Sequence, residues 1–214
     1  MSFKLGLTGS IGMGKSTTAQ MFADAGCDVW DADAAVHRLY AIGGAAVAPM
    51  KALLPEVIID DAVSRDALRE VIQADPSILK HIEQIVHPLV GQDRAEFIAN
   101  SKQDILVFDI PILFETGGNK TMDAVACVSV DAATQRARVL ARGTMSEAQF
   151  EQILAKQMPI EEKRALSDYV IETDTLEHAK TQVEAIVRDI KGKLQNVIET
   201  VIINFIILFE RKHG

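Results

Sequence analysis

The run Gly9-Ser10-Ile11-Gly12-Met13-Gly14-Lys15-Ser16 decides the fold of this chain, because it matches the phosphate-binding pattern Gly-x-x-x-x-Gly-Lys-Ser. Residues 3–8 before it are mainly apolar and predict a short buried strand, and the residues from Ser16 onward have the spacing of an amphipathic helix. A simple glycine-rich turn is the alternative. The lysine–serine pair, both flanking elements and the position near the start of the chain favour a phosphate-binding loop.

This loop predicts binding of ATP together with Mg²⁺. Its glycines allow backbone N–H groups to approach phosphate oxygens, and the following helix adds the positive end of its dipole. Lys15 is expected to reach the β- and γ-phosphates, and the Ser16 hydroxyl to ligate Mg²⁺. The predicted ATP-binding residues of the loop are Gly9, Ile11, Gly12, Met13, Gly14, Lys15, Ser16 and Thr17.

Length and composition limit the possible function classes. A chain of 214 residues suits one α/β domain with a small insertion, and its net charge of -8 argues against nucleic acid as a partner. Cys27 and Cys127 each lie in an apolar, strand-like run, which favours buried thiols over a disulfide or a nucleophile. With no signal-peptide pattern at the N-terminus, we expect a cytoplasmic protein that does not contact membranes.

The second predicted strand, residues 27–31, ends in Asp31-Ala32-Asp33. In a parallel α/β sheet that edge is where ligands bind. These carboxylates have three possible roles, which are metal ligation, general base catalysis and capping of the helix that starts near Ala34. Capping is the better interpretation of an isolated Asp-x-Asp, but the nearby phosphate-binding loop favours a role in substrate binding and catalysis.

Residues 34–102 are predicted to be almost wholly helical, with breaks at Gly43-Gly44, Pro55, Asp75-Pro76 and His87-Pro88. At the last of these, one helix should end and another begin, since proline is favoured at the first helical position. A helical insertion at this point of the sheet is placed to cover a second substrate. A histidine at such a boundary is more often a surface or capping residue than a ligand.

Three more strands are predicted at residues 104–109, 123–130 and 168–171, which with the first two give a parallel five-stranded sheet flanked by helices. Asp109 ends an apolar strand, as in a Walker B motif, and is predicted to hold Mg²⁺ through water; a turn-starting aspartate is the plain alternative. The final helix is predicted over residues 175–195.

Arginines on the predicted helix 132–142 suggest a lid over about residues 142–165. Arg142 is next to Gly143 and is expected to stabilise the negative charge of the phosphoryl group in the transition state. Arg138 is predicted to lie on a solvated helix face. The apolar tail, residues 196–214, differs from the rest of the chain. Its apolar run is too short to span a bilayer as a helix and is interrupted by Glu199 and Asn204. The tail has three possible interpretations: a packed extension, a partner-facing segment or an artificial end of the chain.

Together these motifs resemble the dephospho-coenzyme A kinase family over residues 4 to about 190. The resemblance rests on the loop at 7–17, Asp31-Ala32-Asp33, His87-Pro88-Leu89, Pro111-Ile112-Leu113-Phe114-Glu115, and Arg142 with Gln157, Lys163 and Arg164. The family commonly has Gly where this chain has Ser10, and Ser where it has Met13. Neither difference is expected to disturb phosphate binding, because these positions act mainly through their backbone.

The resemblance implies a P-loop kinase fold, with a core of residues 1–33 and 103–195 and a helical coenzyme-binding insertion at 34–102. The implied reaction transfers the ATP γ-phosphoryl group to the ribose 3′-hydroxyl of dephospho-coenzyme A. We expect a monomer or a weak homo-oligomer. Asp33 is implied as the catalytic base beside Lys15 and Arg142. The expected substrate-binding residues are Thr8, Asp31, Asp33 and His87.

Two other functions remain as alternatives to this kinase activity. A nucleoside monophosphate kinase would share the loop, the lid and the metal site. A P-loop switch protein would need Asn-Lys-x-Asp to read guanine, but in Asn119-Lys120-Thr121-Met122-Asp123 the aspartate comes one residue late.

Overall fold

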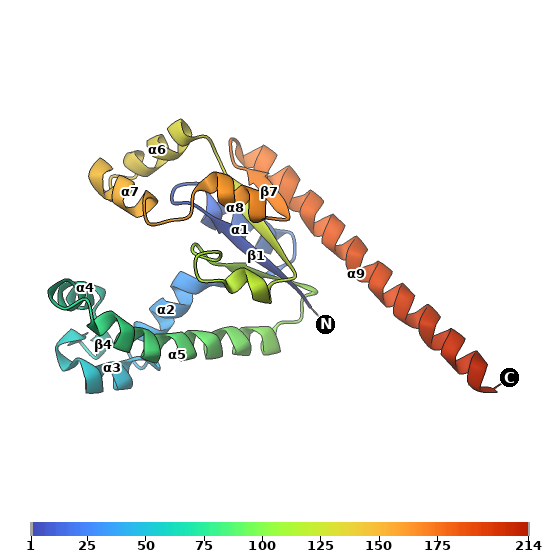
Figure 1. Ribbon diagram of the computed structural model, residues 1–214, viewed down its shortest axis with the longest axis horizontal. Coiled ribbons are helices and arrows are strands. Elements are labelled where there is room, and N and C mark those ends of the chain that lie inside the picture. The colour runs from blue at the N-terminus through green and yellow to red at the C-terminus, as the bar shows by residue number, and fades with distance from the viewer. Residues whose placement is uncertain (1, 214) are drawn as a thin grey trace. The chain divides into compact units, whose positions relative to one another are not determined.

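A computed structural model describes the backbone of residues 2–213 and the side chains of residues 2–196 (Figure 1). The chain divides into two compact units, Met1–Val29 with Lys102–Gly214, and Trp30–Ser101. Each unit has a hydrophobic core of its own, the first built on Leu5, Val107 and Val128 and the second on Met50 and Val57.

The main sheet has five strands in the order β2-β5-β1-β6-β7. The pairs β1–β5, β1–β6 and β6–β7 are parallel, so the carboxyl ends of these strands and the loops that follow them share one edge. The predicted parallel five-stranded sheet is confirmed. Its strands are β1 (Phe3–Gly9), β2 (Asp28–Asp31), β5 (Ile105–Asp109), β6 (Ala124–Ser129) and β7 (Tyr169–Glu172).

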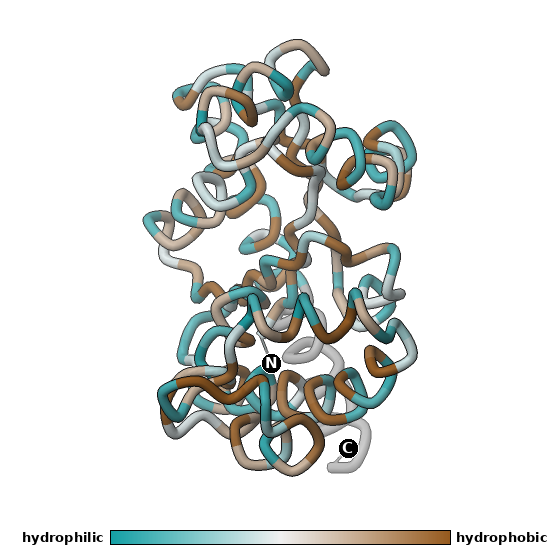
Figure 2. Tube along the Cα trace, turned by 90° about the vertical axis from the view of Figure 1, so that its left-hand side faces the viewer, coloured by the Kyte–Doolittle hydropathy of each residue, from teal (hydrophilic) through white to brown (hydrophobic). Residues whose placement is uncertain are grey.

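Helices flank this sheet because their apolar sides pack against it. Helices α1 and α9 contact each other as well as the strands, and α8 packs on β6. The alternation of brown and teal along the helical turns in Figure 2 is this amphipathic pattern. The helices of the first unit are α1 (Lys15–Asp24), η2 (Gly118–Thr121), α6 (Ala132–Ala141), α7 (Glu147–Leu154), α8 (Ile160–Leu166) and α9 (Leu176–His213).

The two cysteines are free and buried in the first unit, as predicted. Burial raises the pKa of both Cys27 and Cys127 to about 11. Thiols with such a pKa stay protonated at neutral pH, so neither is an activated nucleophile.

The second unit is mainly helical but also contains a hairpin, which the prediction of an almost wholly helical region did not include. Strands β3 (Ile58–Ile59) and β4 (Ala62–Val63) pair antiparallel around Asp60 and Asp61, which both have positive φ. Two such residues give a two-residue hairpin turn, but Asp-Asp lacks the glycine that usually signals one. The other elements are α2 (Ala32–Tyr40), α3 (Val47–Leu53), η1 (Pro55–Val57), α4 (Arg65–Ala74) and α5 (Ile78–Asn100).

The predicted helix boundary at His87-Pro88 is wrong, because α5 runs through Pro88. Proline there removes one backbone hydrogen bond of the helix. Ile82 and Val86 are buried in the core of the second unit, and Leu89 and Val90 pack against it on the other side of the proline. Apolar packing on both sides thus keeps the helix continuous.

Helix α9 is longer than predicted and continues to His213. Ile190 is fully buried against the sheet core, so the first part of the helix belongs to the folded unit. The prediction that residues 196–214 form a packed or partner-facing tail falls almost wholly outside the residues whose side chains are described. Over the residues whose side chains are described, no helix is both long enough and apolar enough to cross a membrane.

Candidate functional site

The predicted phosphate-binding loop connects β1 to α1. A Cβ atom on Gly9 would lie 2.3 Å from Cγ2 of Val128 on the neighbouring strand, so only glycine lets the loop leave the sheet here. Gly14 is the N-cap of α1 with a φ of 87°, and its carbonyl accepts from the N–H and the hydroxyl of Thr18. The loop therefore ends at the N-terminus of a helix, whose free N–H groups suit an anion.

Lys15 and Asp109 form an ion pair at the carboxyl edge of the sheet. Asp109 ends β5 and is 1% exposed, whereas Ser16 is exposed on the first turn of α1. One carboxylate and one hydroxyl suit Mg²⁺, which prefers oxygen ligands and takes the rest from water and substrate phosphates. Among the described side chains, no three His, Cys, Asp or Glu residues cluster as a metal site would require.

A cavity of about 280 Å³ opens beside the loop. Arg142 lines it from the end of α6, is exposed, and makes no ion pair with any described side chain. The other lining residues belong to the loop, α1, α6 and the segment between β7 and α9, and they are Gly12, Gly14, Thr17, Thr18, Met21, Arg138, Thr173, Asp174, Thr175, Leu176 and Ala179.

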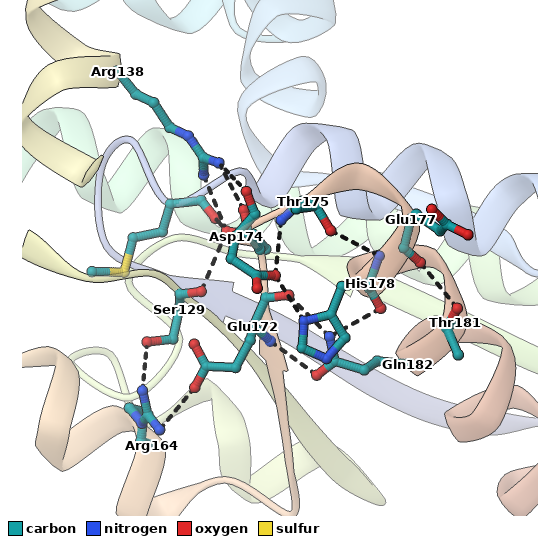
Figure 3. Close-up of polar contacts among 12 residues, drawn as sticks. Ser129, Arg138, Arg164, Glu172, Asp174, Thr175, Glu177, His178, Thr181 and Gln182 are labelled. Atoms are coloured by element: carbon teal, nitrogen blue, oxygen red, sulfur yellow. Dashed lines mark hydrogen bonds and ion pairs between the residues drawn. The ribbon is translucent and has the colours of Figure 1, made fainter.

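Arg138 is not part of a solvated helix face, contrary to the prediction. Its guanidinium donates to the Thr173 carbonyl at 2.7 Å and to the Thr173 hydroxyl at 3.2 Å. Figure 3 shows the Arg138 side chain with its hydrogen bonds as dashed lines. Arg138 also lines the cavity. The hydroxyl of Thr173 in turn donates to the carbonyl of Met13 at 2.8 Å. Arg138 therefore holds Thr173, and Thr173 in turn is bonded to the phosphate-binding loop.

The sequence analysis did not identify residues 173–176 as part of the site, although all four line the cavity. It follows β7, so it lies at the same sheet edge as the loops after β1 and β5. Its position directly after the last strand was the available signal. Thr173, the first residue past that strand, would have been the position to examine.

The loop after β5 is held by a buried lysine. Lys163 is 0% exposed and donates to the Pro111 carbonyl at 2.9 Å, and it pairs with Glu115 at 2.8 Å. Burial tends to raise the pKa of Glu115, but hydrogen bonds from Lys163 and from the Met158 N–H hold this pKa below its ordinary value. Thr8 is also buried and donates its hydroxyl to the Pro111 carbonyl at 3.1 Å. These contacts fix the segment that begins with Asp109.

The remaining predicted site residues lie in the second unit. Asp31 is the N-cap of α2, where its carboxylate accepts from the Ala34 N–H at 2.9 Å. Asp33 lies two residues further on, exposed in the first helical turn. The capping role considered for the pair therefore belongs to Asp31, and the Asp33 carboxylate is not needed for it. His87 is exposed in the middle of α5.

The matching family model and the sequence relatives name the same family. The family model described as "Dephospho-CoA kinase" matches residues 3–178. A dephospho-CoA kinase of Ruegeria pomeroyi is 69% identical over 192 residues, which cover 90% of this chain and 98% of the relative.

Solved structures show the same fold. A crystal structure of a protein from Thermus thermophilus has a TM-score of 0.79 at 29% identity, over 88% of this chain and 97% of the other. The dephospho-CoA kinase from Campylobacter jejuni has a TM-score of 0.66 at 22% identity and covers 90% of this chain and 100% of its own.

Proposed function

Because this chain belongs to the dephospho-CoA kinase family, we propose that it transfers the γ-phosphoryl group of ATP to the 3′-hydroxyl of dephospho-CoA. It is a kinase that phosphorylates an alcohol group. The observation that carries the proposal is the cavity between the phosphate-binding loop and two arginines, Arg138 and Arg142, within a chain that is 69% identical to a dephospho-CoA kinase.

ATP is proposed to lie in this cavity with its phosphates on the loop. Backbone N–H groups of the loop that have no acceptor among the described residues, such as that of Gly12, and the Lys15 ammonium would hold the phosphates, while Arg138 and the segment 173–176 face the nucleoside. Arg142 is exposed and unpaired among the described side chains, so it is available to neutralise charge on the group in transfer.

Ser16 and Asp109 are proposed to hold Mg²⁺ together with the phosphates of ATP. The ion, when bound, supplies positive charge to the β- and γ-phosphate oxygens. In the structure Asp109 pairs with Lys15. Lys15 is free to turn towards the phosphates once Asp109 has another positive partner.

The acceptor side of the reaction is proposed to depend on the second unit, residues 30–101. Asp33 would orient the 3′-hydroxyl and accept its proton as the bond to phosphorus forms. Asp31, His87 and Thr8 are proposed to help bind dephospho-CoA. The lid is proposed to span about residues 142–165.

The remaining proposals concern partners and location. We infer a cytoplasmic enzyme, monomeric or weakly self-associating, which contacts neither nucleic acid nor membranes. The net charge of -8 supports the absence of a nucleic-acid partner.

An acceptor panel tests the proposed function. Purified protein with ATP and Mg²⁺ would be offered dephospho-CoA, AMP, CMP and shikimate, and ADP release would be measured. We expect turnover with dephospho-CoA that exceeds turnover with the other acceptors by at least about a hundredfold, and 3′-phosphorylated product by mass spectrometry. Preferred turnover of AMP or CMP would establish a nucleoside monophosphate kinase instead.

A further inference from the structure

Ile11 has both of its backbone groups bonded to glutamine side chains from outside the phosphate-binding loop. Nε2 of Gln135 donates to the Ile11 carbonyl at 2.7 Å, and the Ile11 N–H donates to Oε1 of Gln157 at 3.1 Å. Gln135 lies on α6 and is only 3% exposed. A buried amide that bonds to a loop backbone fixes that backbone firmly, since breaking the bond would leave buried polar groups unpaired.

Ile11 is part of a tight turn within the loop. The Met13 N–H donates to the Ser10 carbonyl at 3.2 Å, and Gly12, the third residue of the turn, has a φ of 79°. A positive φ at this position is the mark of a type II turn. Types I and II differ by a flip of the central peptide, which here consists of the Ile11 carbonyl and the Gly12 N–H.

Glycine at position 12 does not by itself choose between these two orientations. A Cβ atom there would lie 2.4 Å from Cγ2 of Val139 on α6, so the packing admits only glycine. Glycine, however, populates positive and negative φ about equally. The choice therefore needs a contact to the peptide itself, and Gln135 provides it by donating to the Ile11 carbonyl.

The chosen orientation has a consequence for the cavity. In a trans peptide the C=O and N–H groups point in opposite directions, and the described residues contain no cis peptide. With the Ile11 carbonyl directed at Gln135, the Gly12 N–H is directed away from it. Gly12 lines the cavity, and its N–H has no acceptor among the described residues.

We propose that Gln135 is a positioning residue for ATP, which locks the Ile11–Gly12 peptide so that the Gly12 N–H faces the cavity and donates to a phosphate oxygen. Gln157 accepts from the Ile11 N–H, so both backbone groups of Ile11 are hydrogen-bonded to glutamine side chains. The inference rests on the proposed binding of ATP in this cavity. It goes further by assigning a role to a side chain that does not itself touch the nucleotide.

The test is a Gln135→Met variant, which keeps the side-chain length and loses the donor. ATP and ADP should bind about tenfold more weakly, the expected loss for one hydrogen bond to a charged group. AMP, which lacks the β- and γ-phosphates, should bind as to the parent protein. The ¹⁵N–¹H resonance of Gly12 should shift or broaden in the free variant as the peptide samples both orientations.

Gln182 offers a matched control. Like Gln135, it donates its side-chain amide to a backbone carbonyl, that of Glu172 at 2.9 Å, and it also accepts from the Glu172 N–H at 3.0 Å (Figure 3). Gln182→Met should lower the melting temperature comparably and leave the ratio of ATP to AMP affinity unchanged. The inference is overturned if Gln135→Met binds ATP like the parent, loses ATP and AMP alike, or behaves like Gln182→Met. A parent protein that binds no ATP would overturn the proposed function instead.

Discussion

The Lys15 ammonium forms an ion pair with the carboxylate of Asp109, a side chain that is 1% exposed at the end of β5. Both residues are predicted to serve ATP, the lysine through the phosphates and the aspartate through Mg²⁺. The pair places a positive charge beside a buried carboxylate, so the same two residues contribute to stability as well as to the proposed catalysis.

Lys15→Met should therefore destabilise the free protein as well as abolish turnover. Removing one partner of a buried ion pair costs up to about 3–5 kcal/mol, because the remaining charge loses its counter-charge. Lys15→Arg keeps the positive charge and should retain most of the stability, but its planar group does not replace the ammonium at the phosphates. Urea denaturation without nucleotide, followed by a turnover assay, measures both effects. Parental stability in Lys15→Met would show that the pair is not what compensates Asp109.

The pair of Lys163 and Glu115 predicts a pH-dependent stability. The pKa of Glu115 is lowered on folding, so the pair stabilises the protein above pH 4.5, the carboxyl's ordinary pKa, and this stabilisation is lost as the pH falls through the lowered value. Glu115→Gln leaves buried Lys163 without its counter-charge and should cost about 3 kcal/mol at pH 7. The difference from the parent should shrink below pH 4.5 in denaturation experiments.

An exposed ion pair serves as the control for that experiment. Arg164 and Glu172 are 42% and 38% exposed, so Glu172→Gln should cost less than about 1 kcal/mol at pH 7. Equal losses in Glu115→Gln and Glu172→Gln would argue against a special role for the pair of Lys163 and Glu115.

Local patterns predicted the elements of this fold well, while contacts between distant segments were out of reach. The loop at 9–16 and all five strands of the main sheet follow from short-range sequence patterns. The continuation of α5 through Pro88 depends on packing against the core of the second unit, which a local proline rule does not include. Tertiary contacts override local propensity at such positions.

The same limit applies to the candidate site. The sequence pointed to Arg142 because it precedes a glycine, but the cavity also includes Arg138, whose bonds to Thr173 join residues 35 positions apart. Gln135 and Ile11 are 124 positions apart. No motif connects such pairs, so their contacts become visible only in the folded chain.

Arg142→Ala should lower kcat much more than it weakens ATP binding. Charge grows on the transferred group in the transition state, so an arginine at the cavity edge that makes no ion pair with a described side chain contributes most there. We expect a loss in kcat of about a hundredfold or more, with ATP affinity within about threefold of the parent. Arg188→Ala, on the exposed side of α9, is the control for losing one positive charge. Equal losses in kcat and ATP affinity, or none in either, would contradict the proposed role.

Asp33→Asn should remove the catalytic base while the fold and ATP binding survive. A ribose hydroxyl is a poor nucleophile at neutral pH, and an amide keeps the carboxylate's shape but does not accept the proton, so kcat should fall by about a hundred- to ten-thousandfold. Helix capping does not explain such a loss, because Asp31 caps α2. Asp66 occupies the same position in the first turn of α4, and Asp66→Asn should change helix stability similarly while leaving kcat unchanged. ATP titration and turnover of both variants decide the matter: Asp33→Asn turnover within about threefold of the parent would exclude Asp33 as the base.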